Sequence, residues 1–408
     1  MFLTYLDRIS ISLVGKRIIS EFNLTNTQFG WVLSAFSLAY AIFEIPAGIM
    51  GDRKGQRIVL IRIVIWWSLF TALTGVATGL ISLILIRFLF GMGEAGALPT
   101  TSGVISHWLP SSELSRGLAI ALIGQITGAA LAPFIVVPLA EAFGWRSTFF
   151  VNGFIGLLWI LICVSWFRNN PSEMKRISKE EKKFIEENRR ITSHSTTISW
   201  KNILRNRSML ALTSSFFCSQ WGMYFFIAWM PVYLQQGRHF SENNMKYMTS
   251  LVFFPAIAAT LIIGFFGDRL VIKKGLKFGR RSIGMSTLGL NSILFLIEAT
   301  THNNIILISC FIMGFACQLV FGTAAFGVCI DVSGNHSGSV SALMNCVGQI
   351  GAFFLAIVFG KIVDTTHSFN TPLFVISSLM LIGCLMWLFV DPTKKLTIDN
   401  KYSDPALA

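Results

Sequence analysis

The stretch GIMGDRKGQR, Gly48 to Arg57, has a counterpart further along the chain in GFFGDRLVIKKGLKFGRR, Gly264 to Arg281. Both stretches end an apolar run, and both contain Gly-x-x-Gly-Asp-Arg followed by further basic residues. A pattern that recurs after about half of the chain predicts two related halves. The repeat therefore predicts a fold in which each half has the same arrangement of elements.

Apolar runs surround both stretches and fill most of the chain. Of its 408 residues, 53% are hydrophobic and 13% are charged, and the mean hydropathy is +0.64. A run of about 18 apolar residues can cross a hydrocarbon core of roughly 30 Å as a helix. The composition therefore predicts an all-α membrane protein with twelve transmembrane helices in two pseudo-symmetric six-helix bundles. The predicted spans are 1–19, 27–50, 58–79, 81–106, 117–141, 146–167, 209–235, 246–267, 281–300, 304–330, 338–362 and 372–390.

These spans divide the chain into four parts. We predict an amino-terminal bundle over 1–167, a linker with an interfacial helix over 168–208, a carboxy-terminal bundle over 209–391 and a tail over 392–408. Only six residues precede Asp7, so we expect the first helix to be short or the natural start to lie upstream of Met1.

Lys and Arg set the expected orientation. They concentrate in the linker, and the chain has a formal net charge of +13. Basic residues near helix ends remain in the cytoplasm. The pattern thus predicts a multi-pass protein of the bacterial inner membrane with both termini cytoplasmic. Nucleic-acid binding is not indicated, because no soluble module carries a basic patch with exposed aromatic residues. We expect a monomer in the lipid bilayer.

The repeated turns after helices 2 and 8 predict a cytoplasmic gate. Their glycines permit close helix approach, and their Asp-Arg pairs can bind neighbouring helix ends. A generally basic loop would explain the Arg and Lys residues but not the repeated Gly and Asp. The predicted gate residues are Gly48, Asp52, Arg53, Arg57, Asp268 and Arg269.

Cys and His do not indicate an enzyme. The seven Cys residues lie in or beside apolar runs without the spacing of metal ligands, and the six His residues are scattered. Such cysteines are typical of packing residues. We therefore predict no enzymatic activity, no cofactor and no metal site.

Four ionisable residues within predicted spans stand out as candidates: Asp7, Arg8, Arg87 and Glu94. A charge at the bilayer centre costs about 2.5 to 3.5 kcal/mol on insertion scales, so such residues usually face the bundle interior and have a function. Arg87 and Glu94 are two turns apart and share one helix face. Asp7 and Arg8 are adjacent, so they point to different neighbours.

The chemistry of these four residues suggests their roles. A guanidinium group binds a carboxylate through two parallel hydrogen bonds, whereas a desolvated Asp or Glu can gain or lose a proton. We expect Arg8 to anchor an organic anion and Asp7 and Glu94 to carry protons. Arg87 is expected to hold one of these carboxylates in its charged form. A permanently paired network that only joins two helices is the alternative.

Several motifs resemble a known family. The loop after helix 2 is similar to the signature of the major facilitator superfamily. Within it, the chain resembles the anion:cation symporter family, which includes bacterial sugar-acid and aromatic-acid permeases and animal sialic-acid, glutamate and phosphate carriers. The resemblance implies the same roles for the charged residues of helices 1 and 4. The motifs are YLDR in helix 1, RFLFGMGEAGALP over 87–99, GWRSTFF over 144–150 and WMPVY over 229–233.

The resemblance also suggests residues that contact the substrate. Tyr5, Tyr40 and Gln125 match family positions near the substrate. For candidates from the second half, ordinary packing between helices is an equal alternative. These candidates are Gln220, Tyr224, Phe326 and Asn345.

Together these features predict a proton-coupled importer of an organic anion that works by alternating access. No Arg or Lys lies between Met209 and Gln236, which favours a monoanion over a dicarboxylate. Helix 5 lacks the Gly-Pro-x-x-Gly-Gly ending of drug:proton antiporters, so drug export is disfavoured. A sodium-driven or exchange carrier and a non-transporting sensor remain alternatives. The sequence leaves the identity of the anion and the stoichiometry open.

Overall fold

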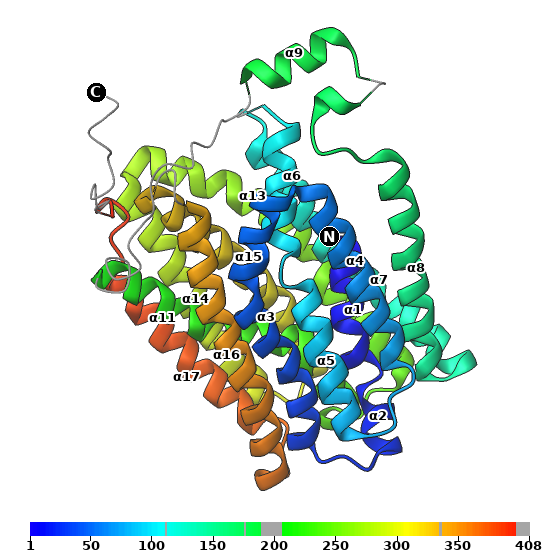
Figure 1. Ribbon diagram of the computed structural model, residues 1–408. Helices are drawn as coiled ribbons and strands as arrows, with labels where there is room; N and C mark the ends of the chain where they lie inside the picture. Colours follow the sequence, from blue (N-terminus) through cyan, green and yellow to red (C-terminus); the bar gives the residue numbers. More distant parts are fainter. Residues whose placement is uncertain (111, 175–176, 189–205, 334–336, 397–408) are drawn as a thin grey trace.

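Figure 1 shows the computed structural model of the chain, a bundle of long helices. It describes all residues except 111, 175–176, 189–205, 334–336 and 397–408, and it leaves the side chains of 51–52, 115, 186 and 260–268 undescribed. Within the described residues the regular elements are all helical, with no strand. The all-α prediction is confirmed.

The first half of the chain contains eight helices, followed by a short 3-10 turn and one helix in the linker. Their order follows the predicted apolar runs. The bounds are α1 (Phe2–Leu13), α2 (Gly15–Glu21), α3 (Asn26–Lys54), α4 (Gln56–Thr74), α5 (Leu80–Glu94), α6 (Ala97–Trp108), α7 (Leu114–Phe143), α8 (Trp145–Trp166), η1 (Pro171–Glu173) and α9 (Lys179–Asn188).

The second half begins with a helix that contains two π-helical stretches, η2 and η3. Five long helices follow it, and the last of them ends in a 3-10 turn, η5. The bounds are α11 (Arg207–Tyr224), η2 (Phe225–Trp229), α12 (Met230–Val232), η3 (Tyr233–Gly237), α13 (Glu242–Lys274), α14 (Leu276–Thr300), α15 (Asn304–Ser333), α16 (Ser337–Thr366), α17 (Thr371–Met386) and η5 (Trp387–Phe389).

Nine segments of the described chain are long and apolar enough to cross a membrane, judged by length and composition. The other three predicted spans correspond to α1 with α2, to α11 through η3, and to α13. The first is divided at Val14, and the fourth span is divided near Gly96 into α5 and α6. All twelve predicted spans are therefore helical, although two of them are divided. π-helical turns such as η2 and η3 are frequent at functional sites.

Each half packs mainly on itself. In the first half α3 lies on α5, α4 on α8 and α1 on α7, and in the second half α14 lies on α15 and α17. The halves meet where α3 packs on α16 and α7 on α13. Gly30 and Gly360 allow the first of these contacts, because a Cβ at either position would collide with the backbone of the facing helix.

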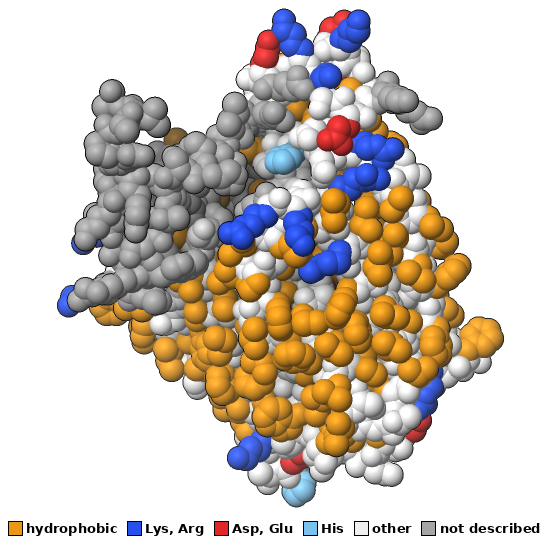
Figure 2. All heavy atoms as spheres, viewed as in Figure 1, with side chains coloured by type: hydrophobic (Ala, Val, Ile, Leu, Met, Phe, Trp, Pro, Cys, Tyr) orange, Lys and Arg blue, Asp and Glu red, His pale blue; other side chains and the backbone are white. Residues whose placement is uncertain are grey.

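Charged side chains gather at the two ends of the bundle, and a hydrophobic surface lies between them (Figure 2). Many large apolar side chains point outward, for example Ile81 at 73% and Leu161 at 68% exposure. This surface suits a lipid environment. We call the end that carries residues 53–57, 273–281 and α9 the basic end, and the other the opposite end.

Polar contacts hold the two halves together at the opposite end. Asp364 of α16 accepts hydrogen bonds from the backbone N–H groups of Asn26 at 3.0 Å and Thr27 at 2.7 Å, at the amino terminus of α3. A carboxylate is favoured there by the helix dipole. Arg17 and Glu242 form an ion pair at 2.8 Å. In the described part of the chain, the hydrogen bonds and ion pairs between the halves lie at this end or deeper in the bundle.

Candidate functional site

The adjacent charges of α1 point to different neighbours. Asp7 is 3% exposed and lies beside Thr71 of α4 and Asn152 of α8, inside the first half. Arg8 extends instead toward α3, α5 and α11. Successive residues of a helix are about 100° apart, so one side chain can face the bundle while the next faces the boundary between the halves. This is the division expected from the sequence.

Arg8 is held by one carboxylate and three aromatic rings. Its Nε donates to Glu94 Oε1 at 2.7 Å, and Glu94 is 0% exposed. The guanidinium carbon lies 5.2 Å from the ring centre of Tyr5 and 4.9 Å from those of Phe36 and Tyr40. Cation–π contacts of this kind stabilise a desolvated cation. Tyr5 and Tyr40, both predicted near substrate, therefore position the predicted anion anchor.

Arg87, expected from the sequence to hold a carboxylate in its charged form, lies against aromatic rings in this conformation. In the described part of the chain it forms no ion pair, and its Nε is buried without a hydrogen-bond partner. Its guanidinium carbon lies 4.6 Å from the ring centre of Phe90 and 5.4 Å from that of Phe36. Arg87 and Glu94 share a helix face but are about 10 Å apart along the axis. Arg8 of α1 reaches Glu94 instead.

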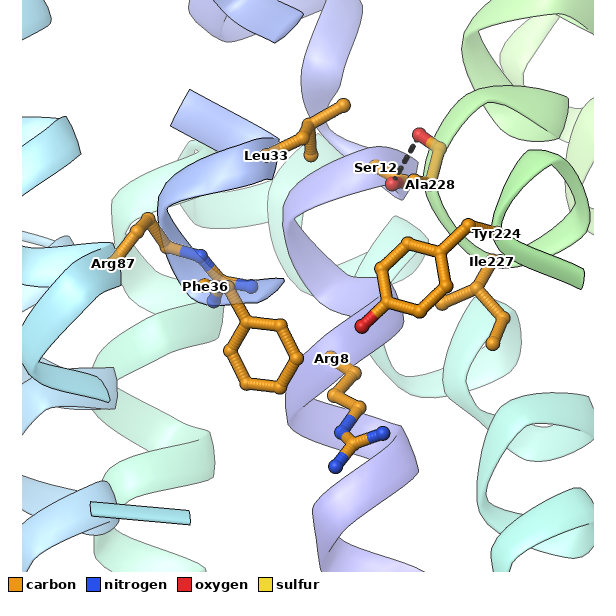
Figure 3. Close-up of a pocket in the computed structure, with 8 residues that line it drawn as sticks. All are labelled: Arg8, Ser12, Leu33, Phe36, Arg87, Tyr224, Ile227 and Ala228. Atoms are coloured by element: carbon orange, nitrogen blue, oxygen red, sulfur yellow. Dashed lines mark hydrogen bonds between the residues drawn. The ribbon is translucent and has the colours of Figure 1, made fainter. Parts of the chain in front are cut away.

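A small cavity lies between Arg8 and Arg87. Figure 3 shows Arg8, Arg87 and Tyr224 around it, coming from α1, α5 and α11. The cavity has a volume of about 20 Å³, enough for roughly one water molecule. Two guanidinium groups and one phenol line it without a carboxylate, so its chemistry favours an anion. Its lining residues are Arg8, Ser12, Leu33, Phe36, Arg87, Tyr224, Ile227 and Ala228.

Among the candidates from the second half, only Tyr224 lines this cavity. Its hydroxyl donates to Gln349 Oε1 at 3.0 Å. Gln220 lies against Gly348 of α16, and Phe326 packs on Phe216 with ring centres 5.9 Å apart. Gln125, from the first half, approaches Met1 Sδ at 4.0 Å. The structure thus leaves Gln125, Gln220 and Phe326 outside the cavity lining in this conformation.

Asn345 makes a contact that the sequence did not suggest. Its Nδ2 donates to both carboxyl oxygens of Glu44 on α3, at 2.7 and 2.8 Å. Glu44 is 3% exposed and lies one turn after Tyr40. The bond joins the two halves between the cavity and the basic end. Sequence reasoning missed Glu44, although a lone acid inside the run 27–50 is itself a sign of function in a membrane helix.

Among the predicted gate residues, Gly48 and Arg57 contact their own half. Arg57 donates from its backbone N to Asn169 Oδ1 at 2.8 Å and from Nη2 to Val164 O at 2.7 Å. Gly48 faces Pro99 of α6, and Arg53 and Arg269 are exposed. The side chains of Asp52 and Asp268 lie outside the described residues.

Metal chemistry has no support in the described part of the chain, where no three His, Cys, Asp or Glu side chains are placed to share a metal ion. The candidate site therefore consists of two arginines, buried carboxyl groups and aromatic rings.

Comparison with known proteins gives three findings. The family model described as Major Facilitator Superfamily matches residues 1–356. The chain is 29% identical to the "Probable sulfoacetate transporter SauU" of Cupriavidus necator, over 98% of this chain and 93% of that protein. It is also 29% identical to the "Probable L-galactonate transporter" of Escherichia coli K12, over 96% of this chain and 88% of that protein.

Solved structures show the same fold. A bacterial homologue of the human lysosomal transporter Spinster, described as inward-facing and occupied, superposes with a TM-score of 0.75 at 18% identity. The match covers 96% of this chain and 94% of that one.

Proposed function

The chain belongs to the Major Facilitator Superfamily of membrane transporters, and we propose that it imports a small organic anion by proton symport through alternating access. The observation that carries this proposal is the cavity between the halves, lined by Arg8, Arg87 and Tyr224. A guanidinium group matches a carboxylate or sulfonate in charge and geometry. The relatives named for sulfoacetate and L-galactonate support an acid of this class.

The Arg8–Glu94 pair supports coupling to protons. The carboxylate of Glu94 pairs with Arg8, with 2.7 Å between Oε1 and Nε. An incoming anion therefore competes with Glu94 for the guanidinium group. Protonation of Glu94 removes the negative charge from this competition. Proton and anion then favour each other's binding, as symport requires. Asp7, buried beside Asn152, is proposed as a second proton carrier.

The contacts between the halves support alternating access. The cavity is too small for an organic acid in this conformation, because its volume is about 20 Å³. Substrate entry therefore requires the halves to separate at one end. Separation at the opposite end would break the Asp364 contacts and the Arg17–Glu242 ion pair, whereas separation at the basic end would break the Glu44–Asn345 bond.

The same proposal includes the orientation. The basic end faces the cytoplasm by the distribution of Lys and Arg, so both termini are cytoplasmic in a bacterial inner membrane. Residues 1–167 and 209–391 are the moving bundles of a monomer, and 168–208 links them.

A thermal-shift screen tests the substrate class. Purified protein is titrated with sulfoacetate, L-galactonate and galactose, because a ligand that binds only the folded state raises its melting temperature. We expect an acid to stabilise the wild type and not the Arg8→Ala variant. Stabilisation by neutral galactose alone contradicts an anion site.

Uptake into proteoliposomes then tests coupling. The stabilising acid should enter with an inward proton gradient when choline replaces sodium. Uptake that needs a sodium gradient would instead identify the sodium-driven carrier, and uptake that needs only internal anion would identify an exchanger.

A further inference from the structure

A buried acid lies in the second half, on a different helix from any residue of the candidate site. Glu298 of α14 is 0% exposed. Neither of its carboxyl oxygens has a hydrogen-bond partner among the described residues. The ion pairs found in the described part of the chain do not include it. This carboxyl group is therefore without a visible means of stabilising a charge.

An unpartnered amide lies next to it. Asn291 is 0% exposed, and both Oδ1 and Nδ2 are buried without a partner in the described part of the chain. It precedes Glu298 by two turns on the same face of α14. A Cβ at Gly314 of α15 would lie 3.0 Å from Asn291 Oδ1 and 3.6 Å from Glu298 Oε1. Both side chains thus lie within contact distance of the position that a Cβ of residue 314 would take.

The surroundings are apolar, with few titratable groups. Phe226, whose ring lies 5.7 Å from that of Phe295, would be 3.2 Å from the Cβ at position 314. Cys310 of α15 and Tyr233 of η3 are close enough to interact electrostatically with Glu298.

A neighbouring cation, Arg238, has other partners. Arg238 donates from Nε to Tyr233 Oη at 2.8 Å and from Nη2 to Thr301 O at 2.7 Å. It reaches only the main-chain oxygen of Glu298, at 3.2 Å. The guanidinium group therefore holds the end of α14 and does not neutralise the carboxylate.

We propose that Glu298 is a proton-binding site whose carboxyl group is neutral in the folded protein, with the unpartnered amide of Asn291 beside the same glycine. An isolated buried carboxylate is so costly that the group becomes neutral instead. A neutral carboxyl and a primary amide each offer a donor and an acceptor, whereas a carboxylate only accepts. A hard metal cation would need more oxygen ligands than this pair supplies. The proposal does not rest on the transport function: Glu298 is expected to bind a proton whether or not the protein transports an anion.

Infrared difference spectroscopy tests the proposal. Wild type and Glu298→Gln are compared at neutral pH in H₂O and D₂O, with Glu180→Gln as the exposed control on α9. We expect the wild type minus Glu298→Gln spectrum to contain the carbonyl band of a neutral carboxylic acid, shifted in D₂O. Besides the amide bands of the introduced Gln, the control difference should contain carboxylate bands and no band of a neutral carboxylic acid. Carboxylate bands in the Glu298→Gln difference, or a neutral band that disappears when sodium replaces choline, would overturn the proposal.

Thermal unfolding gives a second, independent measurement. The unfolded chain releases this proton above a pH of about 4, so retaining it in the folded state costs stability as the pH rises. The melting temperature of Glu298→Gln relative to wild type should therefore increase from acid to neutral pH, with no such trend for Glu180→Gln. Parallel curves for wild type and Glu298→Gln would refute proton binding at this site.

Discussion

The two halves share one helical plan but distribute charge differently. Inside the first half, Asp7, Arg8, Arg87 and Glu94 lie close to one another, and Arg8 and Glu94 form an ion pair. The described interior of the second half instead contains a cluster of aromatic rings around Phe225 and Phe226. Two halves with the same fold can therefore differ in the chemistry of their interiors.

In the middle of the bundle, the second half contacts the buried charges of the first through neutral polar side chains. Tyr224 lines the cavity with Arg8, and Asn345 binds Glu44. A neutral donor stabilises the charged form of a carboxylate less strongly than a guanidinium group does. The carboxyl group therefore remains better able to bind a proton. We infer that the first half binds the anion and the second half closes over it.

The largest expected effect is at Arg8. Arg8→Ala removes the cation proposed to hold the acid, and truncating one partner of a buried, hydrogen-bonded charge pair costs about 2 to 5 kcal/mol. We expect binding of the stabilising acid to weaken by at least about thirtyfold, since 1.4 kcal/mol is a factor of ten. Arg8→Lys keeps the charge but loses the planar fork and should weaken binding about tenfold. Ligand titration of detergent-solubilised protein measures both.

Arg116→Lys is the control for this prediction, because the side chain of Arg116 is 78% exposed. It should leave affinity unchanged. Equal affinity in wild type and Arg8→Lys would show that the first half does not grip the anion through a bidentate contact.

Glu94→Gln tests whether coupling also belongs to the first half. The variant resembles the protonated residue and frees Arg8, so anion affinity at neutral pH should stay or rise by up to about tenfold, given about 1.5 to 3 kcal/mol for a hydrogen bond to a charged group. Uptake should lose its response to a proton gradient. Counterflow and gradient-driven uptake in proteoliposomes separate the two effects.

Asp7→Asn provides the comparison within the same helix. Asp7 does not line the cavity, so binding should persist while gradient-driven uptake falls.

A loss of binding in Glu94→Gln as large as in Arg8→Ala would make Glu94 part of the anion site.

The Glu44–Asn345 bond tests how the halves are joined. A double-mutant cycle with Glu44→Ala and Asn345→Ala should give a coupling energy of about 1 to 3 kcal/mol in the free energy of unfolding, because a buried carboxylate loses its described donor. The matched cycle uses Arg17→Ala and Glu242→Ala, whose side chains are 34% and 23% exposed. Partly exposed pairs contribute about 0 to 1 kcal/mol. A larger coupling for the Arg17 pair would mean that the deep contact does not join the halves.

The sequence predicted the helices well because each span is a long apolar run with polar ends. It also predicted that Asp7 and Arg8 diverge, since helix geometry alone decides this. The partner of Glu94 could not be predicted, because it depends on the depth and rotation of α1 against α5. Leu33 and Ile227 line the cavity, yet nothing in the sequence distinguishes them from ordinary packing residues.

Two buried acids could have been found from the sequence. Glu44 and Glu298 each stand alone in an apolar run, which is the same criterion that identified Glu94. Their different environments could not be predicted, however. Glu44 meets Asn345 across the boundary between the halves, whereas Glu298 has no partner in the described part of its own half. Tertiary packing decides this difference.

The smallest expected effect concerns the basic ends of the halves. In the first half, Arg57 binds the neutral acceptors Asn169 and Val164. In the second half, Lys277 at the start of α14 pairs at 2.9 Å with Asp391, which follows η5 outside the membrane-spanning helices. A hydrogen bond from Thr393, and then one from Lys277, lower the pKa of Asp391 to about 2.

Asp391→Asn should therefore destabilise the protein only slightly and in a pH-dependent way. The lowered pKa in the folded state gives stability that is present above the unfolded pKa of about 4 and is lost as the pH falls toward 2. Because the Lys277 side chain is 51% exposed, we expect under about 1 kcal/mol at pH 7. Thermal unfolding from pH 7 downward should show the difference between wild type and variant shrinking below pH 4 or so. Asn169→Ala, at the basic end of the first half, should give a difference that does not follow this titration, since its contact with Arg57 contains no acid. A difference for Asp391→Asn that stays constant with pH would mean that both basic ends are held by neutral hydrogen bonds alone.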